Sequence, residues 1–267
     1  MRQWSHQQRI KVQRAMMQQG HQTLAEIAKE IRKLMNGKAT GESGIVAELL
    51  KAGCQYLVDR LGSLFRRVWE EETVPGDWRS GVVIPLHKKG DKMNLDNYRG
   101  ITLMDVVGKV FSGIIRNRIE RAFQDKIAEE QAGFRKGRGC VDQAYSLAQT
   151  VLKRLEKQKD TFLCFVDLKK AYDSVWRDGL FRKMEQEGVP LKLVRLVRAW
   201  YHGVSVRVRV NNVLSSSFVT KVGVRQGDKY LVTFALQHLH QWYCAESEGR
   251  WSWWRVGRLK NSCLALC

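Results

Sequence analysis

The residues best suited to chemistry lie in one stretch, FLCFVDLKKAYDSV, at positions 162–175. Its apolar beginning predicts a strand over residues 162–168, which would hold Asp167 in a fixed direction. Such a carboxylate can bind a metal ion, while the backbone N–H groups of the following turn can meet phosphate oxygens and Tyr172 can lie flat against a ribose. In the alternative interpretation, Asp167 or Asp173 caps the next helix and Tyr172 belongs to the core.

The chain is strongly basic, with 46 lysines and arginines against 27 aspartates and glutamates, and its formal net charge is +19 over 267 residues. Nucleic acid is the obvious partner, although membrane-surface binding and plain solubility are also compatible with this charge. Apolar residues make up 44%, which is enough for a sizeable core in one large or two small domains. No apolar run reaches the roughly 18–20 residues of a membrane helix.

Two features indicate the compartment. Residues 1–22 lack the apolar segment of a secretion signal, and the six cysteines are scattered rather than arranged as a disulfide framework. We therefore expect an intracellular protein without membrane partners, and both the nucleus and the cytoplasm remain open.

Hydrophobic periodicity predicts the elements that position the reactive stretch. A helix begins after a Thr23 cap and stops at Asn36-Gly37. Strict alternation over residues 205–210 predicts a strand that Asn211-Asn212 turns back into residues 217–224, as a hairpin with one basic face. The other predicted elements are helices over residues 45–58, 104–123, 141–155 and 191–201 and a buried strand over residues 82–86. In the helix over 104–123, four basic residues are expected to face solvent: Lys109, Arg116, Arg118 and Arg121.

Five blocks of sequence, in order, resemble reverse transcriptases, most closely the non-LTR (LINE-type) retrotransposon branch. They are NGKA at 36–39 with AELLK at 47–51, IPLHKKGD at 84–91 with NYRGITL at 97–103, EQAGFRKGRGC at 130–140, the stretch around Asp167, and GVRQG at 223–227. One block alone is weak evidence, whereas the ordered set is specific. The resemblance implies an α+β fold, with right-hand polymerase fingers and an incomplete palm over residues 68–230. A helical N-terminal extension over residues 1–67 would precede them, and a divergent tail over residues 231–267 would follow.

The resemblance also implies an activity, RNA-directed DNA polymerisation, in which deoxynucleoside triphosphates are added to a DNA primer on an RNA template. Asp167 would hold the catalytic Mg²⁺ or Mn²⁺ ions. The nucleotide would contact Arg99, Lys88 or Lys89, Gln226, and Tyr172 as the steric gate that senses the sugar 2′ position. The residues along the template would be Phe134, Arg135, Lys136 and Arg138. From composition alone, Lys88, Lys89 and Arg99 would instead form a solvated basic turn.

The resemblance changes at Gly227. Reverse transcriptases continue with a small residue and Ser-Pro, and they later supply further carboxylates in an aromatic-Ala-Asp-Asp motif. Here Asp228 and Lys229 follow, no such motif occurs, and residues 228–267 have clustered tryptophans and few acidic residues. Our hypothesis is a frameshift or aberrant splice near Gly227, which would leave a truncated, poorly soluble and defective enzyme. The alternatives are an enzyme with unusual metal ligands, a catalytically inactive basic module that binds RNA or DNA, and a non-functional remnant.

Overall fold

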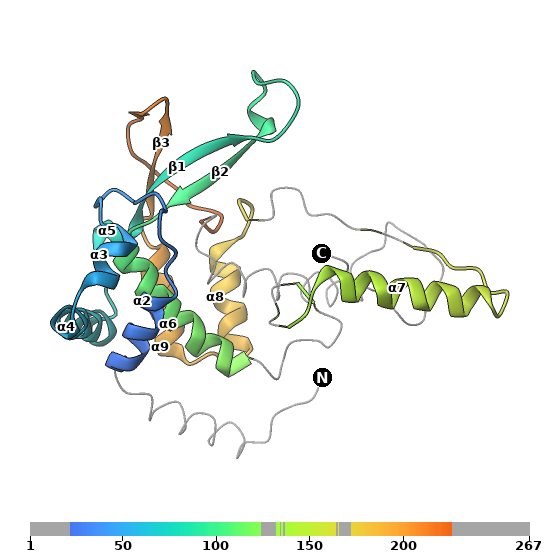
Figure 1. Ribbon diagram of the computed structural model, residues 1–267, viewed down its shortest axis with the longest axis horizontal. Helices are drawn as coiled ribbons and strands as arrows, with labels where there is room; N and C mark the ends of the chain where they lie inside the picture. The colour runs from blue at the N-terminus through green and yellow to red at the C-terminus, as the bar shows by residue number, and fades with distance from the viewer. Residues whose placement is uncertain are drawn as a thin grey trace, which may run out of the picture. The chain divides into compact units, whose positions relative to one another are not determined.

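The computed structural model describes residues 22–123, 132–133, 135, 137–163, 165 and 172–225 (Figure 1). Described residues up to 122 and from 172 onward belong to one compact unit, and those from 123 to 165 belong to a second. The helices of the first unit are α2 (Leu24–Arg32), α3 (Ala47–Ala52), α4 (Gln55–Glu71), α5 (Gly76–Arg79), α6 (Val106–Phe123), α8 (Arg177–Gln186) and α9 (Leu191–Tyr201). Its strands are β1 (Ser80–His87), β2 (Tyr98–Leu103), β3 (Ser205–Val210), β4 (Val213–Leu214) and β5 (Phe218–Val219), with a 3₁₀ turn η1 (Leu95–Asn97) before β2. This mixture of helices and a small mixed sheet agrees with the predicted α+β class.

The sheet of the first unit runs in the order β2-β1-β3-β4, and β5 also pairs with β3. β1 is antiparallel to β2 and parallel to β3, so Val82 lies opposite both Leu103 and Arg207. Residues that lie opposite one another share a face of the sheet. One face therefore carries alternating apolar residues of β1 and β2 and ends at the pair of Leu86 and Arg99.

An aromatic cluster joins four helices of the first unit. The ring centroid of Phe65 in α4 lies 5.8 Å from that of Trp78 in α5 and 5.3 Å from that of Phe111 in α6. Trp200 of α9 completes the cluster, 6.1 Å from Trp78, and all four rings are buried. Because Trp78 lies just before β1, this packing fixes the start of β1, the first strand of the β1–β2 hairpin.

Several predicted elements are confirmed. α9 and β3 have the predicted bounds, and β1 contains the strand predicted over residues 82–86. Thr23 caps α2, and its hydroxyl accepts a hydrogen bond from the Glu26 N–H over 3.2 Å. α6 begins at Val106 rather than at residue 104, because the carboxylate of Asp105 accepts a hydrogen bond from the Gly108 N–H and caps the helix.

The single helix predicted over residues 45–58 is wrong, because two helices, α3 and α4, occupy this region. Gly53 ends the first with an extended backbone (ψ 133°), and glycine is a poor helix former. The second helix continues far beyond residue 58, to Glu71, because it buries a stripe that includes Leu61 and Phe65.

The hairpin after β3 is confirmed at its turn and wrong in its return strand. Asn211 and Asn212 both have positive φ, as a two-residue hairpin turn requires. In place of one strand over residues 217–224 there are two short ones, β4 and β5. Ser215 lies between them and accepts a hydrogen bond from the Val208 N–H with its side chain, which replaces a regular ladder contact.

The solvent position predicted for Arg118 is also wrong, because only 5% of its side chain is exposed. Its guanidinium lies 2.8 Å from the Glu26 carboxylate and 4.8 Å from the centre of the Trp69 ring. A basic residue on an amphipathic helix is normally predicted to face solvent. Arg118 can be buried because it has an acidic partner on α2.

The second unit contains α7 (Cys140–Leu155), which confirms the helix predicted over residues 141–155. Of the strand predicted over residues 162–168, only Phe162, Leu163 and Phe165 are described, and none of them lies in a strand. Their side chains are exposed, and no described strand pairs with them, so this part of the prediction is wrong. None of the helices within the described ranges has the length and hydropathy to cross a bilayer.

Candidate nucleotide and nucleic-acid site

The β1–β2 hairpin gathers three of the predicted nucleotide-binding residues at one end. Lys88 and Lys89 directly follow β1, and Arg99 is the second residue of β2, opposite Leu86. The Lys88 N–H donates to the Asn97 carbonyl over 2.8 Å, so the two strands stay paired up to the loop. All three basic side chains are exposed. Cations grouped in this way can neutralise a triphosphate, and arginine adds a bidentate fork.

The sheet face that carries Arg99 also holds a hollow of about 470 Å³. Its lining residues come from three separate parts of the chain: Ala39, Ile84, Leu86, Ile101, Leu103, Arg209, Asn211 and Asn212. The segment that contains Ala39 is held at the sheet by an ion pair of 3.6 Å between Glu42 and Arg207. The Ser43 hydroxyl of the same segment donates to the Asp105 carboxylate. The structure therefore brings the first two of the five sequence blocks together.

Residues 172–175 and 223–225 lie side by side in the first unit, although about fifty positions separate them. The Val224 N–H donates to the Tyr172 carbonyl over 2.7 Å, and the Gly223 N–H donates to the Val175 carbonyl over 2.9 Å. Residues 172–175 are the end of the fourth sequence block, and residues 223–225 are the start of the fifth. The hydrogen bonds therefore fix the backbone of Tyr172 beside the segment that leads to Gln226.

The alternative role of Asp173 as a helix cap is wrong. α8 begins at Arg177, and its N-cap residue is Trp176. Asp173 is exposed, and Tyr172 is half-buried rather than enclosed in the core.

We call the contact between residues 172–175 and 223–225 the junction. It is held by a buried arginine that no motif in the sequence indicated. Arg177 is only 8% exposed, and its guanidinium donates to the carbonyls of Gly223 (2.8 Å) and Val222 (3.1 Å). It also donates to the carbonyl and hydroxyl of Thr220, and its guanidinium carbon lies 5.1 Å from the Tyr201 ring centre. Burial lowers the pKa of Arg177, Tyr201 opposes this change, and the positive charge of Arg225 reinforces it. The side chain stays charged, because arginine is not deprotonated in proteins.

Arg225, within the fifth block, is buried as well. It donates to the Trp78 carbonyl over 2.8 Å, and its guanidinium carbon lies 5.3 Å from the Trp200 ring centre. The residue before Gln226 is thus tied to the start of β1. No local signal could have revealed either arginine, because their partners are carbonyls and rings that are distant in the sequence.

Asp167, Phe134, Lys136 and Gln226 lie outside the described residues. Arg135 and Arg138 belong to the second unit, where the Arg138 N–H donates to the Arg135 carbonyl over 3.3 Å in a turn. Within the described ranges, no group of three or more acidic, histidine or cysteine side chains could hold a metal ion.

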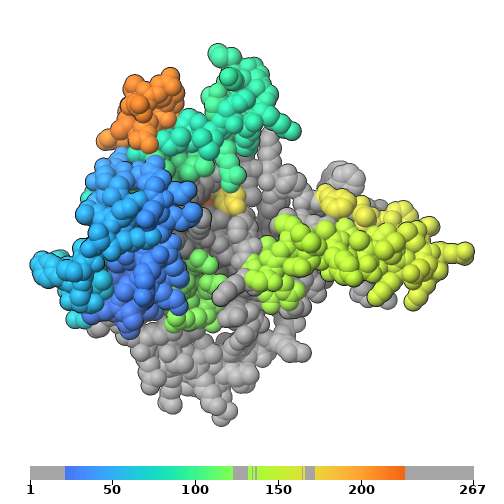
Figure 2. All heavy atoms as spheres, viewed as in Figure 1, coloured from blue at the N-terminus to red at the C-terminus, as the bar shows by residue number. Residues whose placement is uncertain are grey.

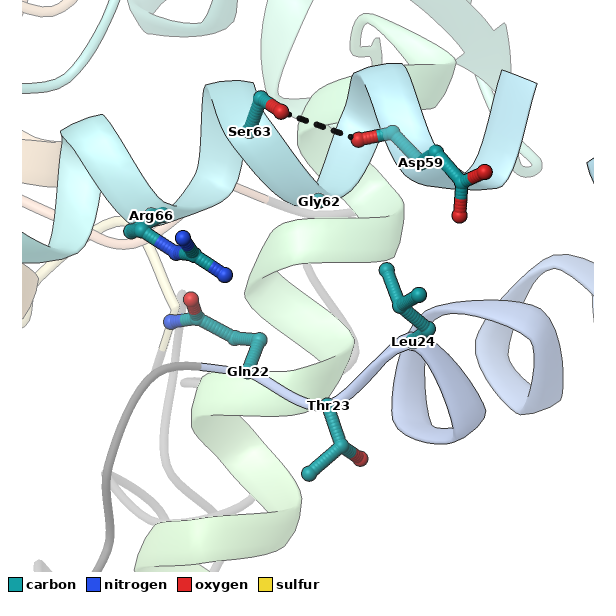
Figure 3. A pocket seen from close by; sticks show the side chains of 7 residues that line it. All are labelled: Gln22, Thr23, Leu24, Asp59, Gly62, Ser63 and Arg66. Atoms are coloured by element: carbon teal, nitrogen blue, oxygen red, sulfur yellow. Dashed lines mark hydrogen bonds between the residues drawn. The ribbon is translucent and has the colours of Figure 1, made fainter. Parts of the chain in front are cut away.

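A second hollow, of about 450 Å³, lies between the start of α2 and α4 and contains none of the predicted site residues (Figure 3). Figure 3 shows the side chains of Gln22 and Arg66 pointing toward one another across it. Gly62 faces Leu24 there, and a Cβ at position 62 would lie 2.6 Å from the Leu24 side chain.

The chain is similar to proteins of several retrotransposons. The chain is 26% identical over 205 residues to the "Probable RNA-directed DNA polymerase from transposon BS" of Drosophila melanogaster, which covers 76% of this chain and 22% of that protein. It is 28% identical over 208 residues to the RNA-directed DNA polymerase from mobile element jockey of the same species, covering 77% and 23%. It is 25% identical over 164 residues to the Pol polyprotein from type-1 retrotransposable element R1 of Bradysia coprophila, covering 60% and 16%.

The chain thus spans about a fifth of the length of these relatives. Residues 86–243 match the family described as reverse transcriptase (RNA-dependent DNA polymerase), and this match extends past Gly227. It covers more than half of the chain and contains the hairpin cations, Tyr172 and Arg225. The chain therefore belongs to the reverse transcriptase family, and its relatives place it in the non-LTR, LINE-type retrotransposon branch.

Proposed function

We propose that this chain supplies the fingers and the first part of the palm of an RNA-directed DNA polymerase. The observation that carries the proposal is the pair of backbone hydrogen bonds between residues 172–175 and 223–224. In this function the triphosphate of an incoming deoxynucleotide contacts Lys88 or Lys89 and Arg99, while Tyr172 and Gln226 contact the sugar and base. Phe134, Arg135, Lys136 and Arg138 lie along the RNA template.

The reaction is the transfer of a nucleotidyl group to the 3′ end of a DNA primer. The oxygen of the primer 3′-hydroxyl loses its proton to water and forms a bond to the α-phosphorus. The bond from the α-phosphorus to the oxygen that bridges to the β-phosphate breaks, and pyrophosphate leaves. Such a reaction depends mainly on positioning and on neutralisation of phosphate charge. Asp167 would hold Mg²⁺ or Mn²⁺, and such an ion would supply further charge stabilisation at the reacting phosphate. The exposed cations of the hairpin neutralise the charge that remains on the leaving pyrophosphate.

Primer extension on an RNA template, with Mg²⁺ and with Mn²⁺, tests this proposal. The wild-type chain should extend the primer, and Asp167→Ala should abolish the signal, whereas Asp160→Ala, a change in the turn after α7, should leave it intact. Equal extension by wild type and Asp167→Ala would exclude polymerisation by this site. A second measurement concerns sugar choice. Tyr172→Ala should incorporate ribonucleotides more readily relative to deoxynucleotides, because a smaller side chain leaves room for the 2′-hydroxyl.

A second candidate function is a catalytically inactive module that binds RNA or DNA. The observation that favours it is the group of exposed cations Lys88, Lys89 and Arg99, which can contact phosphates without a metal ion. In that case the chain binds nucleic acid in a salt-dependent way and extends no primer. The encoding DNA tests our frameshift hypothesis, against which the family match through residue 243 already counts. If neither of the other two reading frames beyond Gly227 encodes an aromatic-Ala-Asp-Asp motif within about a hundred codons, this hypothesis is wrong.

A further inference from the structure

Residues 220–223 lead from β5 into the fifth sequence block and belong to no strand. They follow the base of the hairpin that protrudes in orange at the top of Figure 2, where β5 pairs with the start of β3. Outside a strand, their carbonyls need other donors. Arg177 supplies them: its Nε donates to the Gly223 carbonyl over 2.8 Å, and its other two nitrogens donate to the carbonyls of Val222 and Thr220. One buried side chain therefore takes the place of a strand partner for these three carbonyls.

The same segment holds the backbone of Tyr172. The Gly223 N–H donates to the Val175 carbonyl over 2.9 Å, and the Val224 N–H donates to the Tyr172 carbonyl over 2.7 Å. Gly223 is thus held at its carbonyl by Arg177 and at its N–H by Val175. A shift of residues 220–223 therefore passes to the backbone of Tyr172 through the junction.

The side chain of Tyr172 depends on that backbone for its position. It is half-buried, its hydroxyl makes no hydrogen bond to another described residue, and its ring makes no ring or cation contact with one. In the proposed function this side chain distinguishes a 2′-hydroxyl from a hydrogen atom by steric contact. A displacement of about 0.5–1 Å already removes a large part of such a contact. Sugar selection should therefore be sensitive to small shifts of residues 220–223.

The guanidinium of Arg177 is suited to holding this segment by its shape. Its three nitrogens donate at once to Gly223, Val222 and Thr220, whose hydroxyl also accepts a hydrogen bond over 2.9 Å. Arginine carries its donors in a rigid planar fork, whereas the lysine ammonium is a compact point charge on a flexible stem. Every acceptor of Arg177 is an uncharged carbonyl or hydroxyl oxygen. The side chain therefore acts through its geometry rather than through an ion pair.

We propose that Arg177 is a positioning residue for sugar selection. It holds residues 220–223, and through them the backbone of Tyr172, where the tyrosine ring excludes the 2′-hydroxyl of a ribonucleotide. The proposal rests on the proposed function for the role of Tyr172. It goes beyond that function because it assigns selectivity to a buried residue that does not touch the nucleotide.

The test measures the binding of dATP and ATP by equilibrium dialysis, with the full chain on an RNA template whose DNA primer ends in a dideoxynucleotide. Such a primer cannot be extended, so the measurement does not depend on catalysis. Wild type should bind dATP more tightly than ATP. Arg177→Lys should lower this ratio of affinities by about tenfold, because a misplacement of about 1 Å can cost up to about a hundredfold in a binding or catalytic site.

A milder variant keeps the test decisive if Arg177→Lys does not fold. Thr220→Val removes only the hydroxyl that accepts from Arg177 and leaves the Thr220 carbonyl in place. It should lower the ratio in the same direction, by less than Arg177→Lys does.

Two controls separate positioning from a general loss of stability. Met184→Ala removes a fully buried side chain about two turns further along α8, so it should lower stability in urea and yet keep the wild-type ratio. In the Tyr172→Ala background, Arg177→Lys should change the ratio no further, because a residue that acts through Tyr172 has no effect of its own once that side chain is removed.

Each outcome distinguishes the positioning role from the proposed polymerase. Wild-type ratios in folded Arg177→Lys and in Thr220→Val overturn the positioning role and leave the polymerase intact. An equal fall in Met184→Ala, or a further fall in the Tyr172→Ala background, also overturns it. Selective dATP binding that depends on Arg177, without primer extension, supports the positioning role and contradicts polymerisation by this chain. If wild type shows no preference for dATP, the roles of Tyr172 and Arg177 are both wrong.

Discussion

Among single residues, Gly223 allows the backbones of the fourth and fifth sequence blocks to approach one another closely. Its φ is +81°, and a Cβ at this position would lie 2.8 Å from the Asp173 carbonyl oxygen. Only glycine has both the conformational freedom and the missing side chain that this contact requires. The hydrogen bond from the Val224 N–H to Tyr172 depends on the same close approach.

Gly223→Ala should therefore lower the free energy of unfolding by roughly 3 kcal/mol, from left-handed strain plus a backbone clash. Gly44→Ala is the matched control, because Gly44 has a similar φ of +71° but nothing within 4 Å of its Cβ position. It should cost only about 1–2 kcal/mol. Urea titration measures both, and equal losses would show that Gly223 is needed for its backbone conformation alone.

Arg177 makes a second prediction at this scale. Arg177→Met should lower the free energy of unfolding by about 3 kcal/mol, because buried carbonyls that lose their donor cost about 1–3 kcal/mol each. Arg182→Met, on the same helix, removes an exposed guanidinium that stacks on Trp176, at 5.5 Å, and should cost about 0.5–1 kcal/mol. If both variants unfold at the same urea concentration, Arg177 does not hold the junction.

At the scale of elements, polar contacts dock the N-terminal helix α2 on α6. Arg118 of α6 binds Glu26 of α2, and Asn117 donates to the Glu30 carboxylate over 2.7 Å. Burial raises the pKa of Glu26, but the hydrogen bonds from Arg118 and the Thr23 N–H outweigh it and leave this pKa below its usual value of 4.5. The stabilisation from Glu26 is therefore complete above pH 4.5 and is lost as the pH falls through the lowered pKa.

Glu26→Gln should accordingly be less stable than wild type at neutral pH, by about 1–3 kcal/mol. It should also lose less stability than wild type between about pH 5 and pH 3, because the neutral amide does not titrate. The control is Glu71→Gln, which breaks an exposed pair with Arg67 and should change stability by less than about 0.5 kcal/mol. Parallel pH curves for wild type and Glu26→Gln would contradict this assignment.

At the scale of the whole molecule, the net charge of +19 should make nucleic-acid binding depend strongly on salt. Lys88→Gln/Lys89→Gln should lower the slope of log affinity against log salt by about 1.4 on single-stranded RNA, since each phosphate contact contributes roughly 0.7. Lys157→Gln/Lys159→Gln removes two exposed lysines after α7 and is the charge-matched control. Fluorescence polarisation at several salt concentrations measures the slopes. Identical slopes for the two double variants would show that the hairpin lysines make no special contribution.

Local signals in the sequence predicted much of the first unit. The bounds of α9 and β3 follow from strong periodicity beside Pro190 and the Asn211-Asn212 turn, and the capping box at Thr23 marks the start of α2. The cations of the β1–β2 hairpin were also predicted, because they lie in a short sequence block that occupies its characteristic place in the order of the five blocks. The predicted boundaries at residues 67 and 230 and the metal-binding role of Asp167 stay predictions.

The family, the α+β class and the position of most helices and strands could be predicted from the residues alone, because these features depend on neighbours a few positions apart. Which arginines are buried could be learned only from the folded structure. Arg118 meets Glu26 across 92 positions, and Arg177 meets Gly223 across 46. A charged side chain enters the interior only where partners satisfy it, and partners so distant along the chain leave no mark on the local pattern.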